Sequence, residues 1–394
     1  MNKYIKCVFL YFFISIPFFI QSQSFANWKD SIAGQFEYQR ELFPQEKIYA
    51  HIDRYFYQTN DTVWFALYLV DAATHQPLEV DQIIYVELID GLDSVACRVK
   101  IAPDQHSCYF GYLPILEDYG MGKFMIRAYA PYMVSSDEAY FFKREIIIGG
   151  TQQQTSNAEV LDYDIQFLPE GGQILEGTAC YVAFKAIDEN GLGISVKGEI
   201  VDDEDNSITS FESNNLGMGV FYLTTTPGKE YYARCQTEHN PEIKKHKLPG
   251  ANKQGYALQV KRANNRLLVS VKNVLNQIIN EPLYLLIHSR GIVQEFIQWD
   301  KKKEFIAFQE NLFPAGILHM LLLDQQKQIR SERLVFCMNE ADFARVNFQT
   351  DKQAYQTHEQ IHSTVILKDT NNQPLQGRFS VSVTDNQNSY IDTL

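Results

Sequence analysis

The stretch EKIYAHIDRYFYQTNDTVWFALYLVDAATHQPL, residues 46–78, decides the fold because its residue pattern is repeated later in the chain, from about Val346. The matching positions are Asp53 and Asp351, Arg54 and Lys352, Tyr57 and Tyr355, Gln58 and Gln356, Thr59 and Thr357, Asp61 and Glu359, Asp71 and Asp369, and then, after one deletion, Gln76-Pro77-Leu78 and Gln373-Pro374-Leu375. A repeat of this kind indicates that the chain is an array of similar modules.

The same stretch contains a strand signal between two polar turns. Residues 63–70 are apolar, aromatic or β-branched without a break, which predicts a buried strand. Asp53 and Arg54 precede it, and we interpret them as an ion pair that fixes a turn, with a contact pair for a partner as the alternative. Tyr57 and Tyr355 are expected to bury their rings at the sandwich edge and to hydrogen-bond the backbone through their hydroxyls.

This stretch resembles the opening of a macroglobulin domain, the immunoglobulin-like sandwich that is repeated along alpha-macroglobulins. The positions that carry the resemblance are Asp53, Arg54, Tyr57, Val63, Asp71 and Pro77, while Asn60 stands where the family usually has Gly. A second stretch, FLPEGG at 167–172, resembles one that follows the first such module in many envelope proteins of Gram-negative bacteria. Similar modules occur in front of the plug domains of outer-membrane TonB-dependent receptor-like proteins. The resemblance implies an all-β array of modules and a partner in the cell envelope.

Length, composition and net charge limit the number of domains and the class of partner. A chain of 394 residues is long enough for two to four domains, and 45% hydrophobic residues permit substantial cores. The formal net charge of −13 argues against a nucleic-acid partner, because phosphate binding depends on Lys and Arg.

Residues 1–26 are predicted to be a signal peptide. Lys3 and Lys6 form the basic flank, residues 7–20 form the apolar stretch, and Ser24-Phe25-Ala26 forms the small-residue cleavage site. An uncleaved anchor is the alternative, although the apolar stretch is short for a bilayer. We therefore expect export, with a periplasmic or outer-membrane-associated location.

After the signal peptide the sequence predicts tandem antiparallel immunoglobulin-like β-sandwiches, because strand-sized segments alternate with turns throughout. The expected divisions are a short helical lead-in at 27–43, sandwiches at 44–149, 160–239 and 254–340, and a partial fourth sandwich at 345–394. Residues 151–158 and 240–253 are predicted linkers, the second flanked by His239 and containing an exposed His246. Because the fourth unit offers only three predicted strands (346–350, 361–367 and 377–384), we expect a truncated sandwich and a chain that is the front part of something longer.

Two of the cysteines that follow the signal peptide lie close together in the sequence. Cys97 and Cys108 are predicted to sit on the two arms of a hairpin that turns near Pro103, where they could form a disulfide. Free, buried thiols are the alternative interpretation.

Two stretches of the sequence resemble metal-binding motifs, and each also has a purely structural explanation. His358-Glu359-Gln360-Ile361-His362 matches the H-E-x-x-H zinc signature, but that signature needs a helix, and the neighbouring residues favour a strand. Residues 202–205 are acidic and are followed by Asn206, but the stretch lacks the Gly and Glu positions of a calcium loop, which favours a solvated hairpin turn. The sequence has no G-x-S-x-G, Walker or dinucleotide-binding motif, and no Cys begins the thioester run of alpha-macroglobulins. With the zinc and calcium signatures also disfavoured, no catalytic residue, metal site or cofactor is expected.

These observations lead us to expect a non-enzymatic, exported binding or scaffold protein of the envelope, associated with TonB-dependent transport. A macroglobulin-type protease inhibitor without a thioester is one alternative. An adhesin-like or glycan-binding array is the other, and it predicts a row of exposed aromatic residues on one module.

Overall fold

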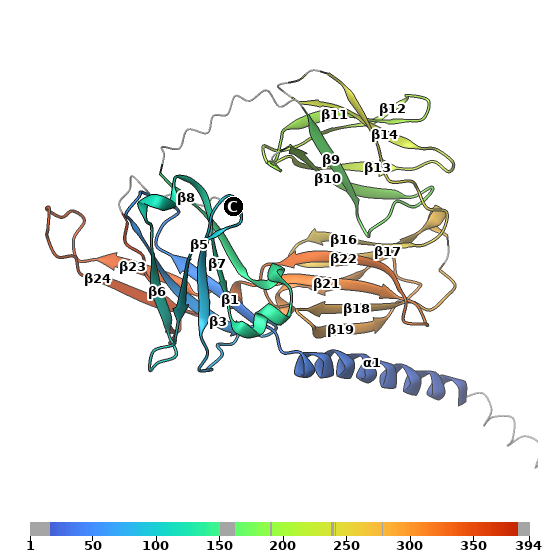
Figure 1. Cartoon of the computed structure of the whole chain (residues 1–394). Helices are drawn as coiled ribbons and strands as arrows, with labels where there is room; N and C mark the ends of the chain where they lie inside the picture. The colour runs from blue at the N-terminus through green and yellow to red at the C-terminus, as the bar shows by residue number, and fades with distance from the viewer. Residues whose placement is uncertain are drawn as a thin grey trace, which may run out of the picture. The chain divides into compact units, whose positions relative to one another are not determined.

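The computed structural model describes residues 16–149, 162–189, 191–237, 240, 242–277 and 279–384, with side chains from Trp28 onward. Regular structure in this part is nearly all β-strand, and the strands form pairs of sheets that pack face to face (Figure 1). Every strand pairing is antiparallel except that between β2 (Phe56–Tyr57) and β8 (Phe142–Ile148). The fold class is therefore all-β, with tandem antiparallel β-sandwiches.

Helix α1 spans Ile16–Leu42, so it begins well before residue 27, where the sequence predicted a short helical lead-in. Pro17 lies in the first turn, where a missing N–H costs nothing. The helix stops just before Phe43-Pro44, because the residue ahead of a proline disfavours helical geometry. Within the described residues no helix is both long and apolar enough to cross a membrane. Residues 1–15 of the predicted signal peptide lie outside the described part.

The first sandwich is built from two sheets with one core between them. Its strands are β1 (Glu46–Ile52), β2, β3 (Thr62–Asp71), β4 (Ile84–Ile89), β5 (Val95–Ile101), β6 (Tyr109–Pro114), β7 (Gly122–Tyr129) and β8, with short 3-10 helices η1 (Glu117–Tyr119), η2 (Pro131–Ser135) and η3 (Glu138–Tyr140). Sheet A has the order β1-β3-β6, and sheet B has the order β2-β8-β7-β4-β5. Alternate residues of each strand face inward, so Val63, Ile84 and Ile126 are fully buried between the sheets.

The second sandwich repeats this arrangement. Its strands are β9 (Tyr163–Pro169), β10 (Ala179–Asp188), β11 (Val196–Asp202), β12 (Ser207–Glu212), β13 (Met218–Thr224), β14 (Tyr231–Thr237) and β15 (Lys244–Lys247). Sheet C has the order β13-β10-β9, and its partner sheet has the order β12-β11-β14-β15. Strand β10 lies between β9 and β13 as β3 lies between β1 and β6, so the two sandwiches share one topology.

The third sandwich has the same plan. Its elements are β16 (Tyr256–Ala263), β17 (Arg266–Asn273), η4 (Val274–Asn276), β18 (Tyr284–Ser289), β19 (Ile292–Gln298), β20 (Ile306–Gln309), η5 (Glu310–Leu312), β21 (Gly316–Leu323), β22 (Ile329–Cys337) and η6 (Glu340–Asp342). Its sheets have the orders β16-β17-β20 and β19-β18-β21-β22. Trp28 of α1 packs edge-on against Tyr284 and Phe296, with ring centroids 4.1 Å and 5.3 Å away.

The fourth unit consists, in the described residues, of a hairpin between β23 (Arg345–Thr350) and β24 (Ser363–Lys368). Strand β23 pairs with β24 as β1 pairs with β3. The predicted strand at 377–384 is wrong, because this segment joins no ladder within the described part of the chain. Its contacts with the first sandwich involve side chains, with Arg378 Nη1 donating to the Ser107 carbonyl oxygen (3.1 Å) and Ser380 Oγ bonding the His51 and Tyr68 side chains.

The predicted linker at 240–253 is also wrong in part, because residues 244–247 form β15, an edge strand paired with β14. Its sequence, Lys-Lys-His-Lys, is polar and lies between Pro241 and Pro249, a composition that predicts a linker. Lysine is common on edge strands, where it discourages pairing with other chains. The second sandwich therefore extends to Lys247, beyond the predicted end at residue 239.

The FLPEGG stretch forms the joint between the second and third sandwiches. Gly171, at φ 80°, packs so closely that an added Cβ would lie 2.8 Å from the carbonyl oxygen of Leu258. The Gly171 carbonyl accepts a hydrogen bond from Ser331 Oγ (2.8 Å), and buried Glu170 accepts one from the Val260 N–H (3.0 Å). Glycine is required here both by the backbone conformation and by the contact.

Gly171→Ala is therefore expected to lower the free energy of unfolding of this pair of sandwiches by about 3 kcal/mol, through left-handed strain and overlap with Leu258. Urea denaturation of the wild type and the variant measures this loss in the free energy of unfolding. Gly172 is the matched control, because it has φ 85° but nothing within 4 Å of an added Cβ. Gly172→Ala should cost only the conformational part, about 1 kcal/mol. Equal losses in the two variants would contradict the role of the contact.

Candidate functional site

The repeated Asp and Tyr form a hydrogen-bonded network at the entry to β3. The Tyr57 hydroxyl lies 2.7 Å from Asp53 Oδ1 and 2.7 Å from the Arg54 carbonyl oxygen. The Trp64 N–H donates to the same Asp53 Oδ1 (2.9 Å), and the Asp53 N–H donates to the Trp64 carbonyl (3.0 Å). Burial and the Asp53 carboxylate raise the pKa of Tyr57 far above its usual value, so the hydroxyl stays protonated and available as a donor.

Arg54 braces the turn that follows. Its Nη2 lies 3.2 Å from Asp61 Oδ2, closer than the 3.4 Å from its Nε to Asp53 Oδ2. Asp61 Oδ2 also accepts the Gln58 N–H (2.8 Å). The guanidinium carbon lies 4.9 Å from the centre of the Tyr57 ring. These contacts place Arg54 inside the turn rather than on a free surface.

The second copy reproduces the network. The Tyr355 hydroxyl bonds Asp351 Oδ1, and the Lys352 N–H donates to the Tyr355 hydroxyl (3.0 Å). The Asp351 N–H donates to the His362 carbonyl (2.9 Å), and the His362 N–H donates to Asp351 Oδ1 (3.2 Å). Lys352 pairs with Glu359 as Arg54 pairs with Asp61. The repeat is thus one of hydrogen bonds as well as of sequence.

This network accounts for the H-E-x-x-H match. His358 has φ 65° at the turn position that Asn60 fills with φ 71°, a conformation that Gly and Asn tolerate best. Glu359 accepts the Gln356 N–H (2.9 Å), as Asp61 accepts that of Gln58. Residues 358–362 lie in a turn and an extended segment, not in a helix. Among the described residues no three His, Cys, Asp or Glu side chains are placed to hold one metal ion.

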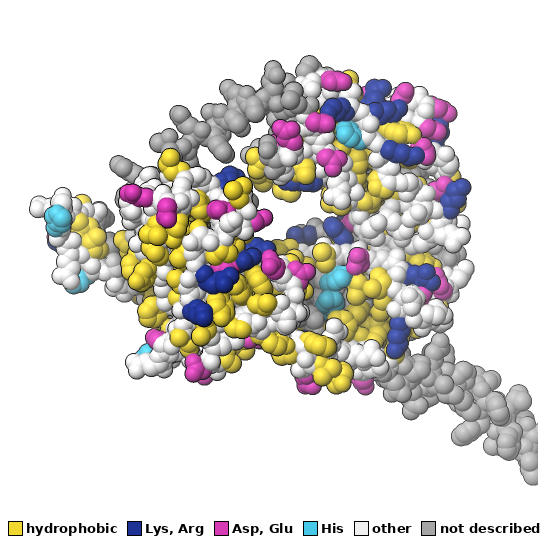
Figure 2. Space-filling view, in the orientation of Figure 1, with side chains coloured by type: hydrophobic (Ala, Val, Ile, Leu, Met, Phe, Trp, Pro, Cys, Tyr) yellow, Lys and Arg dark blue, Asp and Glu magenta, His cyan; other side chains and the backbone are white. Residues whose placement is uncertain are grey.

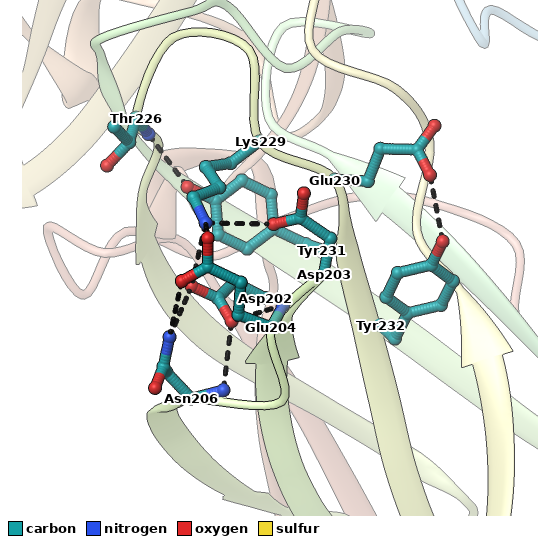
Figure 3. Close-up of polar contacts among 9 residues, drawn as sticks. All are labelled: Asp202, Asp203, Glu204, Asn206, Thr226, Lys229, Glu230, Tyr231 and Tyr232. Carbon is teal, nitrogen blue, oxygen red and sulfur yellow. Dashed lines mark hydrogen bonds and ion pairs between the residues drawn. The ribbon is translucent and has the colours of Figure 1, made fainter.

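The acidic turn between β11 and β12 surrounds an ammonium group (Figure 3). Lys229 Nζ lies 2.7 Å from Glu204, 3.2 Å from Asp203 and 3.7 Å from Asp202. Asp202 Oδ1 accepts the N–H groups of Glu204 and Asn206, both at 2.9 Å. The carboxylates raise the pKa of Lys229 above its usual value. The Asp203 and Glu204 side chains remain exposed to solvent, and a lysine from the loop after β13 offsets part of the negative charge of the turn.

The histidine prediction is wrong for His246, which lies in β15 with its ring 5.6 Å from that of Tyr163. Burial lowers the pKa of His246, so the ring is neutral at neutral pH. His239 lies outside the described residues.

The predicted hairpin between Cys97 and Cys108 is wrong, because β5 belongs to sheet B and β6 to sheet A. No ladder brings the two residues side by side, and both thiols are free. Cys180 and Cys337 are buried, and burial raises the pKa of each thiol to about 11. At neutral pH both are therefore protonated and weakly reactive.

The outer face of sheet B carries a buried carboxylate. Glu87 of β4 is fully buried between Arg98 Nε (2.5 Å), Arg127 Nη2 (2.6 Å) and the Tyr129 hydroxyl (2.9 Å). Burial acts to raise the pKa of Glu87, but the hydrogen bonds from these groups outweigh it and hold the pKa below its usual value. Figure 2 shows Lys and Arg side chains gathered over β5 and β7, on this face.

The outer face of sheet A is the strongest candidate for a binding site. We call it the aromatic face, and its residues are Tyr49, Trp64, Tyr68, Phe110 and Tyr112. Trp64 of β3 lies opposite Tyr112 of β6, with ring centroids 5.2 Å apart, and Tyr49 lies opposite Tyr68 at 6.3 Å. Trp64 is 57% exposed, Phe110 63% and Tyr112 55%. Contiguous exposed rings of this kind are typical of binding surfaces.

The prediction of a buried strand at 63–70 is therefore wrong for half of its residues. Val63, Phe65 and Leu67 face the core, whereas Trp64 and Tyr68 face outward. The run was interpreted as buried because aromatic residues fill the outward positions that polar residues usually take.

Polar groups lie beside the rings. Ser380 Oγ is 2.6 Å from His51 Nδ1 and 2.8 Å from the Tyr68 hydroxyl, which places Ser380 on the aromatic face, over β1 and β3. The face thus combines apolar rings with hydroxyl and imidazole groups and can contact a ligand that is partly apolar and partly hydroxylated.

Comparisons with known proteins give distant similarities. No protein-family model matches the sequence. No curated protein matches it either. Among solved structures, the chain is similar to Escherichia coli alpha-2-macroglobulin activated by porcine elastase, at 10% identity and a TM-score of 0.29, covering 83% of this chain and 33% of that one. It is also similar to Salmonella alpha-2-macroglobulin reacted with methylamine, at 10% identity and a TM-score of 0.23, covering 82% and 25%.

A third similarity is to an Escherichia coli adhesin, at 12% identity and a TM-score of 0.17, covering 75% of this chain and 97% of that one. The chain spans a third or less of the length of the two alpha-2-macroglobulins. At these identities and TM-scores the similarities decide nothing about binding, and the fold assignment depends on the sheets and hydrogen bonds described above.

Proposed function

We propose that the chain is a non-enzymatic binding or scaffold protein whose β-sandwiches present ligand-binding faces. The aromatic face of sheet A is the observation that supports this proposal. Exposed Trp, Tyr and Phe side chains are enriched in binding surfaces, because each buries a large apolar area for few rotatable bonds. The core does not require them, since Val63 and Phe65 already fill the inner side of β3.

We further propose that the protein is exported and acts in a Gram-negative cell envelope, in the periplasm or at the outer membrane. The basic flank, apolar stretch and cleavage signal within residues 1–26 support export. The resemblance of residues 46–78 and of FLPEGG to macroglobulin-like modules supports a protein partner among outer-membrane receptor components of the TonB-dependent class. The net charge of −13 disfavours nucleic acid as a partner.

Site-specific photo-crosslinking in the producing cell tests this proposal. A photoreactive amino acid is placed at Trp64 or Phe110 in the full chain. The matched control position is Leu92, which is 88% exposed in a turn of the same sandwich but outside the aromatic face. We expect discrete adducts from the two face positions and none from Leu92. Absence of adducts at all three, or equal adducts at all three, would overturn the proposal.

A further inference from the structure

A segment of the chain itself lies on the aromatic face. Residues 376–384 belong to the same compact unit as the first sandwich. The Tyr68 hydroxyl donates to Ser380 Oγ (2.8 Å), and Ser380 Oγ lies 2.6 Å from His51 Nδ1. A serine hydroxyl can accept one hydrogen bond and donate another at the same time. The aromatic face therefore already holds a peptide side chain through a pair of hydrogen bonds.

The residues around Ser380 explain why a small side chain is seated there. Ala66 of β3 lies opposite His51 in the β1–β3 ladder and opposite Phe110 in the β3–β6 ladder. Tyr68 follows two residues later on the same face of β3. Alanine is much shorter than these neighbours, so a small side chain can approach the sheet between them. Serine meets this requirement and brings the hydroxyl that His51 and Tyr68 bind.

The segment is held on the face by side chains alone. It pairs with no strand that the structure describes. Besides the bonds of the serine, Arg378 Nη1 donates to the Ser107 carbonyl oxygen in the turn before β6 (3.1 Å). Phe379, Val381 and Val383 are 54%, 60% and 90% exposed, so the apolar side chains of the segment bury little area here. A segment attached in this way can leave the face without unfolding the sandwich.

The segment also leaves most of the rings uncovered. With it in place, Trp64 is 57% exposed, Phe110 63% and Tyr112 55%. A polypeptide that keeps the hydroxyl contact and also turns apolar side chains toward these rings would bury more apolar area than residues 376–384 do. Such a partner would bind the face more tightly than the segment does.

We propose that the aromatic face binds an extended polypeptide segment of a partner protein, which places a Ser or Thr hydroxyl between His51 Nδ1 and the Tyr68 hydroxyl. Residues 376–384 take this place in the absence of the partner and compete with it. This inference rests on the proposed binding function and names the chemistry of the partner. The occupant that carries it is the peptide seen on the face, whose Ser380 makes both hydrogen bonds.

The competition has a measurable consequence. The competing segment is part of the same chain, so its effective concentration at the face does not fall on dilution. The apparent affinity for an added ligand is reduced by the fraction of molecules whose face is covered. Releasing residues 376–384 should therefore tighten the binding of a peptide added in solution.

The test adds a fluorescein-labelled peptide with the sequence of residues 376–384, QGRFSVSVT, to the full chain and follows fluorescence anisotropy. The released variant of the chain is Arg378→Ala with Ser380→Ala, and it should bind the peptide about fivefold or more tightly than the wild type does. A peptide with Ser380→Ala should bind the released variant about tenfold less tightly, because it lacks the hydroxyl that makes both hydrogen bonds. Adding Tyr68→Phe to the released variant should weaken binding of the unchanged peptide, since it removes one partner and keeps the ring.

Ser382→Ala is the matched control, in the chain and in the peptide, because Ser382 is exposed two residues beyond Ser380. It should change neither affinity, and circular dichroism checks that every variant is folded. If the released variant binds the peptide no better than the wild type, or if the Ser380→Ala peptide binds as well as the unchanged one, the inference is wrong. Photo-crosslinks from Trp64 to material other than protein would keep the proposed binding function and exclude a polypeptide as its ligand, whereas absence of all adducts would overturn the function itself.

Discussion

Tyr57→Ala is expected to lower the free energy of unfolding of the first sandwich by about 4 kcal/mol. The ring is 2% exposed, so its removal opens a cavity in the core beside Val63. Its hydroxyl is also lost, which leaves Asp53 Oδ1 with the Trp64 N–H as its remaining partner in the network. Hydrogen exchange in peptides covering β1 and β3, measured as a function of urea, reports this sandwich separately from the others.

Tyr57→Phe separates the two contributions, because it keeps the ring and removes only the hydroxyl, at a cost of about 1–2 kcal/mol. The second copy offers a matched control. Tyr355 likewise bonds the aspartate and accepts the N–H of the next residue but is only partly buried, so Tyr355→Phe should change the stability of the hairpin by less than about 0.5 kcal/mol. Equal losses at Tyr57 and Tyr355 would mean that burial does not set the value of the network.

The repeat was the most reliable sequence signal because its residues act on the backbone nearby. Asp53, Tyr57 and Asp61 fix a turn through local hydrogen bonds, so the same letters at Asp351 and Tyr355 produce the same geometry. Local contacts of this kind depend only on residues within a short stretch, so they can be recognised by aligning the two copies. The zinc interpretation of residues 358–362 could be rejected from sequence for the same reason.

Features that depend on distant strands could not be predicted. Strand β15 is polar along its whole length and is defined only by its pairing with β14. Lys229 contacts the acidic turn because the loop after β13 lies beside the turn after β11. No local sequence pattern predicts this contact. The exposure of Trp64 likewise depends on how much of the outer face of sheet A other segments cover, which the strand itself does not encode.

Arg127→Leu is expected to lower the free energy of unfolding of the first sandwich by about 3 kcal/mol, because it leaves the buried Glu87 carboxylate without its two-pronged partner. The pH dependence follows from the depressed pKa of Glu87. In the wild type, the ionised network contributes stability above the ordinary carboxyl pKa of 4.5, and this is lost as the pH falls through the lower folded-state value. In Glu87→Gln this part of the acid dependence should disappear.

Lys143 is the matched control for Arg127, since it lies opposite Arg127 in the β7–β8 ladder and is exposed. Lys143→Leu should change the stability by less than about 0.5 kcal/mol. In the double variant Glu87→Leu with Arg127→Leu, the buried charge and its partner leave together, so the loss should be smaller than the sum of the two single losses. Strict additivity would show that Glu87 and Arg127 do not stabilise each other, and the network on sheet B would then have to be explained by its contacts with Arg98 and Tyr129 alone.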